Sequence, residues 1–460
     1  TEAGSFRTLD VRAGISGSVE GVDLRFDAER FATAGTTIAP EASGNAENDG
    51  FSNRTASAAL SFAPAPHLAL DLFAQYTRAA LEIDEFFRDD PNKEDLRTIR
   101  LLQLDATGSF FDRFWTATFD AAVNDQDFDN LDPPDAPGGA RSASYFDGRI
   151  IEAGFKNDLA VHRGATATLG WESRSERGKT SGDAFFAFEK STATHSGYAQ
   201  YQFDLFDRVS GTLGVRIDDN EDFGSETTYG VSAAYRHPET GTKLWSGVGT
   251  GFRAPSLVDL FGGVSGLFVG NPNLKPETSR GWEAGIVQEW FDGRVRTGAT
   301  YFQNDIEDLI EGFVFKPELG LFTAENVNEA RTYGVESFVS LEPLESLVLT
   351  LEHTYTRAED RRTGEDLLRR PKHRGDLSAT WWAMDELSLD LDVLVVGDRT
   401  DIGGVRQGGY YVANLAASYK IDDNLRLFGR IANLFDRRYE DPMGFEHPGL
   451  GAFAGVAVTY

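Results

Sequence analysis

The chain has 460 residues, 25% of them charged, with 48 glycines, no cysteine and a formal net charge of −29. The lack of cysteine excludes disulfides, iron–sulfur clusters and thiolate zinc sites within the chain, and the excess of acidic over basic residues argues against nucleic acid as a partner, because phosphate binding needs a basic surface. Strand-like patterning runs from end to end without a linker or a shift in composition, so we expect one continuous architecture rather than several globular domains.

Segments in which apolar and polar residues alternate recur along the chain. Clear examples are Val209–Asp218, Leu347–Tyr355 and Leu387–Val396. Alternation with a period of two predicts β-strands that have one apolar and one polar face. A soluble β-sandwich alternates in the same way, so this pattern leaves the fold class open.

The connections between these segments are alternately short and long. The predicted tight turns are Ala63–Pro66, Phe110–Arg113, Asp204–Asp207, His237–Gly241, Phe291–Gly293, Glu342–Ser346 and Ile421–Asn424. The predicted long connections are Ala34–Gly50, Asp84–Asp95, Asp125–Arg141, Arg177–Lys190, Arg253–Thr278, Ala358–Arg370 and Asp436–Gly449. Such a series is typical of membrane barrels with short periplasmic turns and long extracellular loops. We therefore predict an all-β fold, a transmembrane antiparallel β-barrel.

The strand count follows from the length of the chain. At about 10 residues per spanning strand, the chain accommodates about 21 complete strands, and Thr1–Gly4 fits the end of one more. A closed barrel leaves no open edge in hydrocarbon, so we predict about 22 strands with the first strand partly missing. No signal peptide begins at Thr1, so we expect an exported protein given in processed or trimmed form.

Two motifs in the middle of the chain resemble a known family. Gly249–Ser256 reads GTGFRAPS and Gly270–Ser279 reads GNPNLKPETS, and both resemble the barrel of TonB-dependent outer-membrane receptors. Supporting motifs follow in the expected order at Asn304–Ile310, Asn326–Glu336, Leu368–Arg374 and Ile431–Glu440. The resemblance implies that residues 1–460 form the β-barrel domain of such a receptor, monomeric and located in the outer membrane of a Gram-negative bacterium.

Within that family the chain looks most similar to the vitamin B12 (cobalamin) receptor branch. Glu47–Phe51 resembles the acidic calcium-binding loop of that branch, and Asp84–Asp95 adds a second acidic stretch in the next long loop. Hard oxygen ligands from flexible loops suit Ca²⁺. The resemblance therefore implies a structural calcium site and no required cofactor. The expected ligands are Glu47, Asp49, Asp89, Asp90 and Asp95, with Glu at position 47 where the pattern has Asp. The alternative is a solvated acidic loop without an ion.

Family members also carry an N-terminal plug domain that fills the lumen and a short Ton box that engages TonB. Neither is found in these 460 residues. We expect that the plug was removed or left out of this sequence, that it is a separate polypeptide, or that the barrel works without it.

The family resemblance implies active uptake of a scarce, bulky nutrient, driven through the TonB complex. Cobalamin or a related corrinoid is the favoured cargo, and an iron siderophore or haem is the alternative. Aromatic side chains in the predicted long loops are the candidate substrate contacts. They are Phe86, Phe87, Phe128, Tyr145, Phe185, Phe186, Phe261 and Phe268. These aromatics also suit packing against one another.

The sequence also bears on other classes of function. A plugless passive pore remains an alternative. Catalysis is rejected, because His162, His195 and His373 are scattered without a serine in an acyl-transfer context. The acidic, proline-rich segment Asp125–Ala140 suits either docking of a surface lipoprotein or a mobile loop.

Overall fold

The computed structural model is a closed antiparallel β-barrel of 22 strands with almost no helix, as the sequence predicts. The structure describes residues 1–38, 47–84, 90, 92–134, 141–183, 187–264 and 266–460, without the side chains of residues 313, 327 and 328. Among these residues no helix is both long and apolar enough to cross a membrane.

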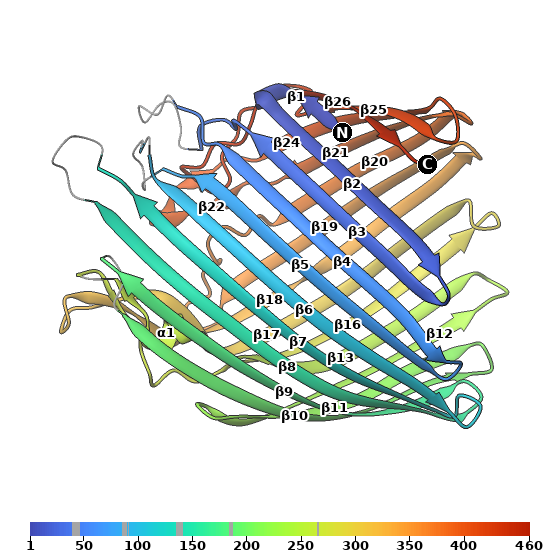
Figure 1. The fold of residues 1–460 in the computed structure, drawn as a ribbon, viewed down its shortest axis with the longest axis horizontal. Helices are drawn as coiled ribbons and strands as arrows, with labels where there is room; N and C mark the ends of the chain where they lie inside the picture. Colours follow the sequence, from blue (N-terminus) through green and yellow to red (C-terminus); the bar gives the residue numbers. More distant parts are fainter. Residues whose placement is uncertain (39–46, 85–89, 91, 135–140, 184–186, 265) are drawn as a thin grey trace.

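Each barrel strand pairs with its neighbour along the chain. The barrel strands are β1 (Glu2–Gly4), β2 (Thr8–Val19), β3 (Val22–Thr33), β4 (Phe51–Ala65), β5 (Leu68–Glu82), β6 (Glu94–Phe110), β7 (Trp115–Asp132), β8 (Ser142–His162), β9 (Ala165–Gly182), β10 (Phe188–Leu205), β11 (Val209–Asn220), β12 (Gly224–His237), β13 (Thr242–Arg253), β16 (Glu277–Trp290), β17 (Val295–Lys316), β18 (Leu321–Leu344), β19 (Leu347–Asp360), β20 (His373–Met384), β21 (Leu387–Val396), β24 (Tyr410–Lys420), β25 (Leu425–Ala432) and β26 (Gly451–Val458). Short turns join them at one end and longer connections at the other (Figure 1).

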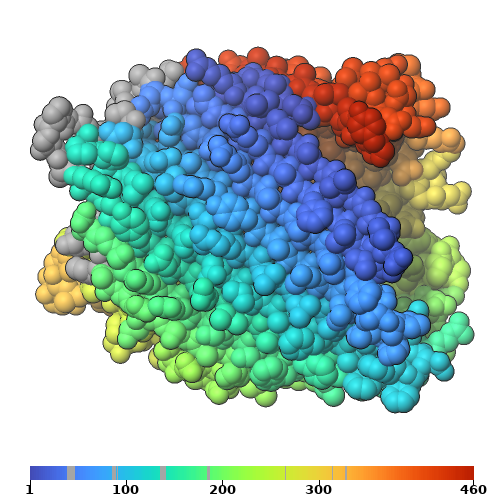
Figure 2. Space-filling model, viewed as in Figure 1, coloured from blue at the N-terminus to red at the C-terminus, as the bar shows by residue number. Residues whose placement is uncertain are grey.

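The barrel closes between its first and last strands. Glu2 of β1 pairs with Gly455 of β26 on one side and with Asp10 of β2 on the other. In the space-filling view the N-terminal strands lie beside C-terminal ones (Figure 2). The prediction that Thr1–Gly4 belongs to a further strand is confirmed, and β1 covers only Thr8–Asp10 of β2.

Several extracellular connections carry structure of their own. They contain the helix α1 (Leu257–Phe261), the short strands β14 (Gly263–Val264), β15 (Phe268–Val269), β22 (Arg399–Thr400) and β23 (Arg406–Gln407), and 3₁₀ turns at Ser5–Arg7 and Ile402–Gly404. β15 pairs in parallel with β18, placing Phe268 opposite Phe322. The connection between β13 and β16 is therefore a folded unit at the end where α1 is labelled (Figure 1).

Two predicted long connections are wrong in extent. β7 continues to Asp132 and β8 begins at Ser142, so the first part of Asp125–Arg141 is strand. β9 continues to Gly182 and β10 begins at Phe188, which leaves residues 183–187 between them. Both misplacements have one cause. Polar residues occupy both faces of these strand ends, so the alternation that marks a strand is absent.

The two faces of the wall differ in chemistry. Large apolar side chains point outward, such as Leu102 (51% exposed) and Leu213 (46% exposed). Charged pairs line the inner face, where Arg174 lies 2.5 Å from Glu152 and Arg216 lies 2.7 Å from Glu172. The interior of the barrel is polar, as expected for a barrel in a membrane.

Candidate functional site

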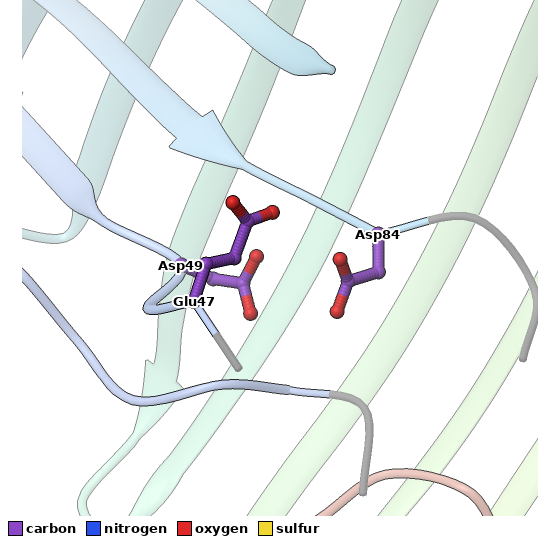
Figure 3. A group of neighbouring side chains, drawn as sticks. All are labelled: Glu47, Asp49 and Asp84. Carbon is purple, nitrogen blue, oxygen red and sulfur yellow. The ribbon is translucent and has the colours of Figure 1, made fainter. Parts of the chain in front are cut away.

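Three carboxylates from two neighbouring loops converge at one end of the barrel. Glu47 and Asp49 precede β4, and Asp84 follows β5. One oxygen of each lies within 4.8 Å of the others, and Figure 3 shows Asp84 facing the other two across the space between the loops. The adjacent backbone fixes Asp49, because Ile38 N donates to Asp49 Oδ2 at 2.6 Å.

The structure brings together part of the predicted calcium ligand set. Asp89 lies outside the described residues. Asp90 is buried, and its backbone N–H donates to Asp84 Oδ1 at 3.1 Å, so it braces Asp84. Asp95 lies in β6, accepts from Asn130 Nδ2 at 2.7 Å and is not one of the converging carboxylates. Asp84 belongs to the second acidic stretch but was missing from the predicted set, because sequence alone does not show which loop carboxylates face each other.

The donor set of Glu47, Asp49 and Asp84 fits a hard cation. All three offer carboxylate oxygens, without the imidazole or thiolate that zinc prefers. Three like charges this close repel each other, and a bound divalent cation would offset that repulsion.

The predicted aromatic contacts do not form one site. Phe86, Phe87, Phe185 and Phe186 lie outside the described residues. Phe128 and Tyr145 lie in β7 and β8, so the prediction that they are loop residues is wrong. The Arg97 guanidinium lies 5.0 Å from the centre of the Phe128 ring. Tyr145 shares the outer face of β8 with the exposed Ile151 and Phe155.

Phe261 and Phe268 both belong to the folded connection between β13 and β16. Phe268 is buried in an apolar cluster with Leu260, Leu274 and Ala324, and Phe261 packs against this cluster. The Lys190 ammonium lies 5.0 Å from the centre of the Phe261 ring. These two aromatics hold their own loop together. A role for any predicted aromatic in ligand binding stays a prediction.

A second ordered group of extracellular residues was not predicted. The rings of Tyr410, Tyr439 and His447 stack at centroid distances of 4.3 Å and 4.6 Å. Tyr410 donates to Asp441 Oδ2 at 2.7 Å, and Arg399 Nη2 lies 2.8 Å from Asp441 Oδ1. Pairing of the successive strands β21, β24, β25 and β26 brings these residues together from two neighbouring connections, and no local sequence pattern signals that.

Comparison with curated proteins finds relatives that include a vitamin B12 transporter. The chain is 32% identical over 238 residues to the vitamin B12 transporter BtuB of Vibrio vulnificus (strain YJ016), and the alignment spans 50% of this chain but 36% of that relative. The chain thus matches little more than a third of the curated relative's length.

Solved structures share the fold at low identity. A ferric enterobactin receptor (PfeA) mutant from Pseudomonas aeruginosa superposes with a TM-score of 0.83 at 19% identity, covering 100% of this chain and 79% of that one. The copper transporter OprC superposes with a TM-score of 0.84 at 14% identity and the same coverage. The siderophore receptor PirA from Acinetobacter baumannii gives 0.81 at 16% identity, covering 100% of this chain and 79% of that one. At these identities the likeness concerns the fold alone.

The family model described as "TonB dependent receptor-like, beta-barrel" matches residues 80–434, which is most of the chain. Together with the closed 22-strand barrel, this match places the protein in the bacterial outer membrane. The chain therefore belongs to the TonB-dependent receptor β-barrel family, as its motifs from Gly249 onward predict.

Proposed function

We propose that this chain is the barrel wall of an outer-membrane transport receptor that binds a scarce, bulky nutrient from outside and imports it with energy from TonB. The family match over residues 80–434 carries this proposal. The favoured cargo is cobalamin or a related corrinoid, supported by the 32% identity to a vitamin B12 transporter. A plug domain, in this polypeptide or a separate one, occludes the lumen and contacts TonB.

Ligand binding to the receptor isolated from its native outer membrane tests the cargo. We expect cyanocobalamin to bind, measured by equilibrium dialysis, and we expect neither a ferric catecholate siderophore nor haem to compete with it. Siderophore or haem binding without cyanocobalamin binding would assign the receptor to the other cargo class. The same preparation in planar bilayers separates transport from passive diffusion, because a large, persistent conductance would favour an open pore.

We further propose that Glu47, Asp49 and Asp84 bind Ca²⁺ and so join the two loops around the mouth of the barrel. Affinity for calcium depends on the number of charged ligands, so Asp49→Asn and Asp84→Asn should each weaken ⁴⁵Ca²⁺ binding by about tenfold or more. Asp95→Asn is the matched control. Its carboxylate accepts from Asn130 instead, so binding should change less than about twofold. Equal binding by all three variants would show that the converging carboxylates hold no ion.

Native mass spectrometry of the receptor in mild detergent tests the partners. We expect a bound small molecule and, where the plug is a separate chain, a non-covalent polypeptide. A surface lipoprotein docked near residues 125–140 would appear in the same spectrum. Spectra that contain only the bare barrel mass would contradict the plugged transporter.

A further inference from the structure

Three arginines lie side by side on the outer face of the barrel. In the strand register Arg30 of β3 lies opposite Arg54 of β4, and Arg54 lies opposite Arg78 of β5. We call these three residues the arginine row. Phe26 of β3 and Tyr76 of β5 are exposed on the outer face, and alternate residues of a strand share a face, so the row also points away from the lumen. This part of the wall faces the viewer in Figure 2.

The arginine row lies at the extracellular end of the apolar outer surface. β4 begins at Phe51 beside a long extracellular connection and runs toward the periplasmic turn after Ala65. Its outward positions change from the charged Arg54 to the exposed Phe62 over nine residues, 54–62. About 9–11 residues of a tilted strand cross the hydrocarbon of a bilayer. The guanidinium groups therefore lie at the level of the lipid headgroups of the outer leaflet.

The arginine row differs from other arginines of the outer face in its lack of acidic partners. Arg100 pairs with Asp127 at 2.7 Å, and Arg149 pairs with Asp125 at 2.5 Å. Within the described part of the chain, no arginine of the row forms an ion pair or a hydrogen bond with an acidic side chain. Like charges directly opposite each other in a sheet repel. An anion that contacts the whole row would remove this repulsion through charge-assisted hydrogen bonds.

A shallow apolar groove adjoins the arginine row on the same outer face. Its volume is about 350 Å³, and two arginines of the row line its extracellular end. Ala13, Ala28 and Ala56 lie opposite one another on β2, β3 and β4, and Tyr76 follows on β5. Their small side chains leave the wall hollow there. Because this face meets lipid, an acyl chain suits the groove.

We propose that the arginine row and the groove together bind one phosphate-bearing lipid of the outer leaflet, with its phosphate against the guanidinium groups and an acyl chain over the alanines. Guanidinium groups bind phosphate through paired hydrogen bonds, and basic sites at a membrane surface recognise anionic headgroups. A second copy of this chain suits the surface less, because a symmetric contact through this face would bring two arginine rows together. The lipid site does not depend on which nutrient is transported.

Lipid binding to the full-length receptor, purified free of bound lipid in mild detergent, tests the arginine row. Lipid A, a phosphorylated glycolipid, is the probe, and native mass spectrometry measures the fraction of receptor that carries it. We expect Arg54→Gln, which removes the central charge, to weaken binding at least about fivefold. Arg149→Gln is the matched control, because Asp125 already compensates that charge, and binding should change less than about twofold. Arg30→Gln replaces Arg54→Gln if the first variant fails to assemble.

A second pair of variants tests the groove. Ala56→Phe fills the groove with an apolar ring and keeps all three arginines, so we expect binding of lipid A to weaken at least about threefold, because fewer methylene groups are buried. Ala121→Phe makes the same change beside Phe119 on the outer face of β7, outside the groove, and should keep binding within about twofold. Inorganic phosphate offers charge without an acyl chain, so an excess of it should not displace lipid A.

Four results would overturn the lipid site. Equal binding of lipid A by Arg54→Gln, Arg149→Gln and the unmodified receptor would show that the arginine row holds no headgroup. Unchanged binding in Ala56→Phe, or displacement of lipid A by inorganic phosphate, would show an anion site without an acyl groove. A receptor dimer that Ala56→Phe abolishes would show that the groove contacts a second copy. None of these results would alter the proposed import of a nutrient, which ligand binding and conductance test separately.

Discussion

Asp401 is completely buried, yet it is held as a carboxylate by groups from three extracellular connections. Arg369 Nε donates to its Oδ1 at 2.8 Å, Ile402 N donates to the same oxygen at 2.7 Å, and Met443 N donates to Oδ2 at 3.1 Å. A buried charge persists only when it is paired and hydrogen-bonded. The Asp401 carboxylate therefore links connections that lie far apart in the sequence.

Replacing Asp401 by Asn should loosen these connections. Asparagine keeps the size but loses the charge opposite Arg369, so we expect a local loss of about 1–3 kcal/mol. Hydrogen exchange at the Ile402 and Met443 amides measures it. The control is Asp398→Asn. Asp398 and its partner Arg406 are both more than half exposed, so removing that pair should change exchange by less than about 1 kcal/mol. Equal effects of the two changes would contradict the stabilising role of the Asp401 carboxylate.

The same carboxylate predicts a pH dependence. Burial raises the pKa of Asp401, but the hydrogen bonds from Arg369, Ile402 and Met443 together outweigh it, so the pKa lies below the ordinary value. A lowered carboxyl pKa stabilises the folded loops above the unfolded value of about 3.9. Protection, corrected for intrinsic exchange, should therefore stay constant from neutral pH to about pH 5 and fall as the pH drops through the lowered pKa. Asp401→Asn should lack this additional fall.

At the scale of elements, the connection between β13 and β16 folds around its own small core. Ser256 and Asp259 cap α1 reciprocally through the Ser256 side chain at 3.1 Å from Asp259 N and the Asp259 carboxylate at 3.1 Å from Ser256 N. A helix as short as α1 is not stable alone. Packing of Leu260 and Phe268 against Ala324 of β18 supplies the remaining stability.

Leu260→Ala should open this connection without unfolding the barrel. Leu260 is 7% exposed, and truncating a buried leucine to alanine typically costs about 2–5 kcal/mol. Leu267→Ala is the matched control in the same connection. Leu267 is 45% exposed, so its effect should stay within about 0.5 kcal/mol. Hydrogen exchange of peptides from residues 254–276 reports the difference, and faster exchange in the barrel strands as well would show that the unit is not independent.

The sequence predicts a strand correctly where one face is apolar and the other is polar. It fails where both faces are polar. The outward side chains of Arg100 and Asp127 pair at 2.7 Å, and those of Asp125 and Arg149 pair at 2.5 Å, on strand ends that carry no apolar face. Alternation is lost there, so Asp125–Arg141 was expected to be a loop. Tyr410 was equally beyond local prediction, because its stacking partner Tyr439 follows two strands later in the chain.

At the scale of the whole molecule, closure removes the free edges that a sheet cannot expose to hydrocarbon. The Thr1 ammonium donates to Val456 O at 2.8 Å, and Glu2 receives two hydrogen bonds from Arg430 at 2.8 Å and 3.0 Å. In all 22 strands the apolar face then points out of the barrel and the polar face points into the lumen. Of two adjacent residues in one strand, one side chain consequently faces lipid and the other faces water in the lumen.

Leu104 and Gln103 of β6 test this orientation as a matched pair. Leu104 lies on the outer face with Leu102 and is 39% exposed, whereas Gln103 points inward and donates to Asp105 Oδ2 at 2.8 Å. Arginine on the lipid face of a barrel costs about 2–4 kcal/mol near the middle of the bilayer, because its charge must leave water. We expect Leu104→Arg to lower the free energy of unfolding by that amount in urea titrations of the barrel in lipid vesicles. Gln103→Arg should change it by less than about 1 kcal/mol, because the new guanidinium stays in the aqueous lumen beside Asp105. The reverse order of the two effects would require Leu104 to face the lumen and Gln103 to face lipid, which is the opposite of the orientation in the structure.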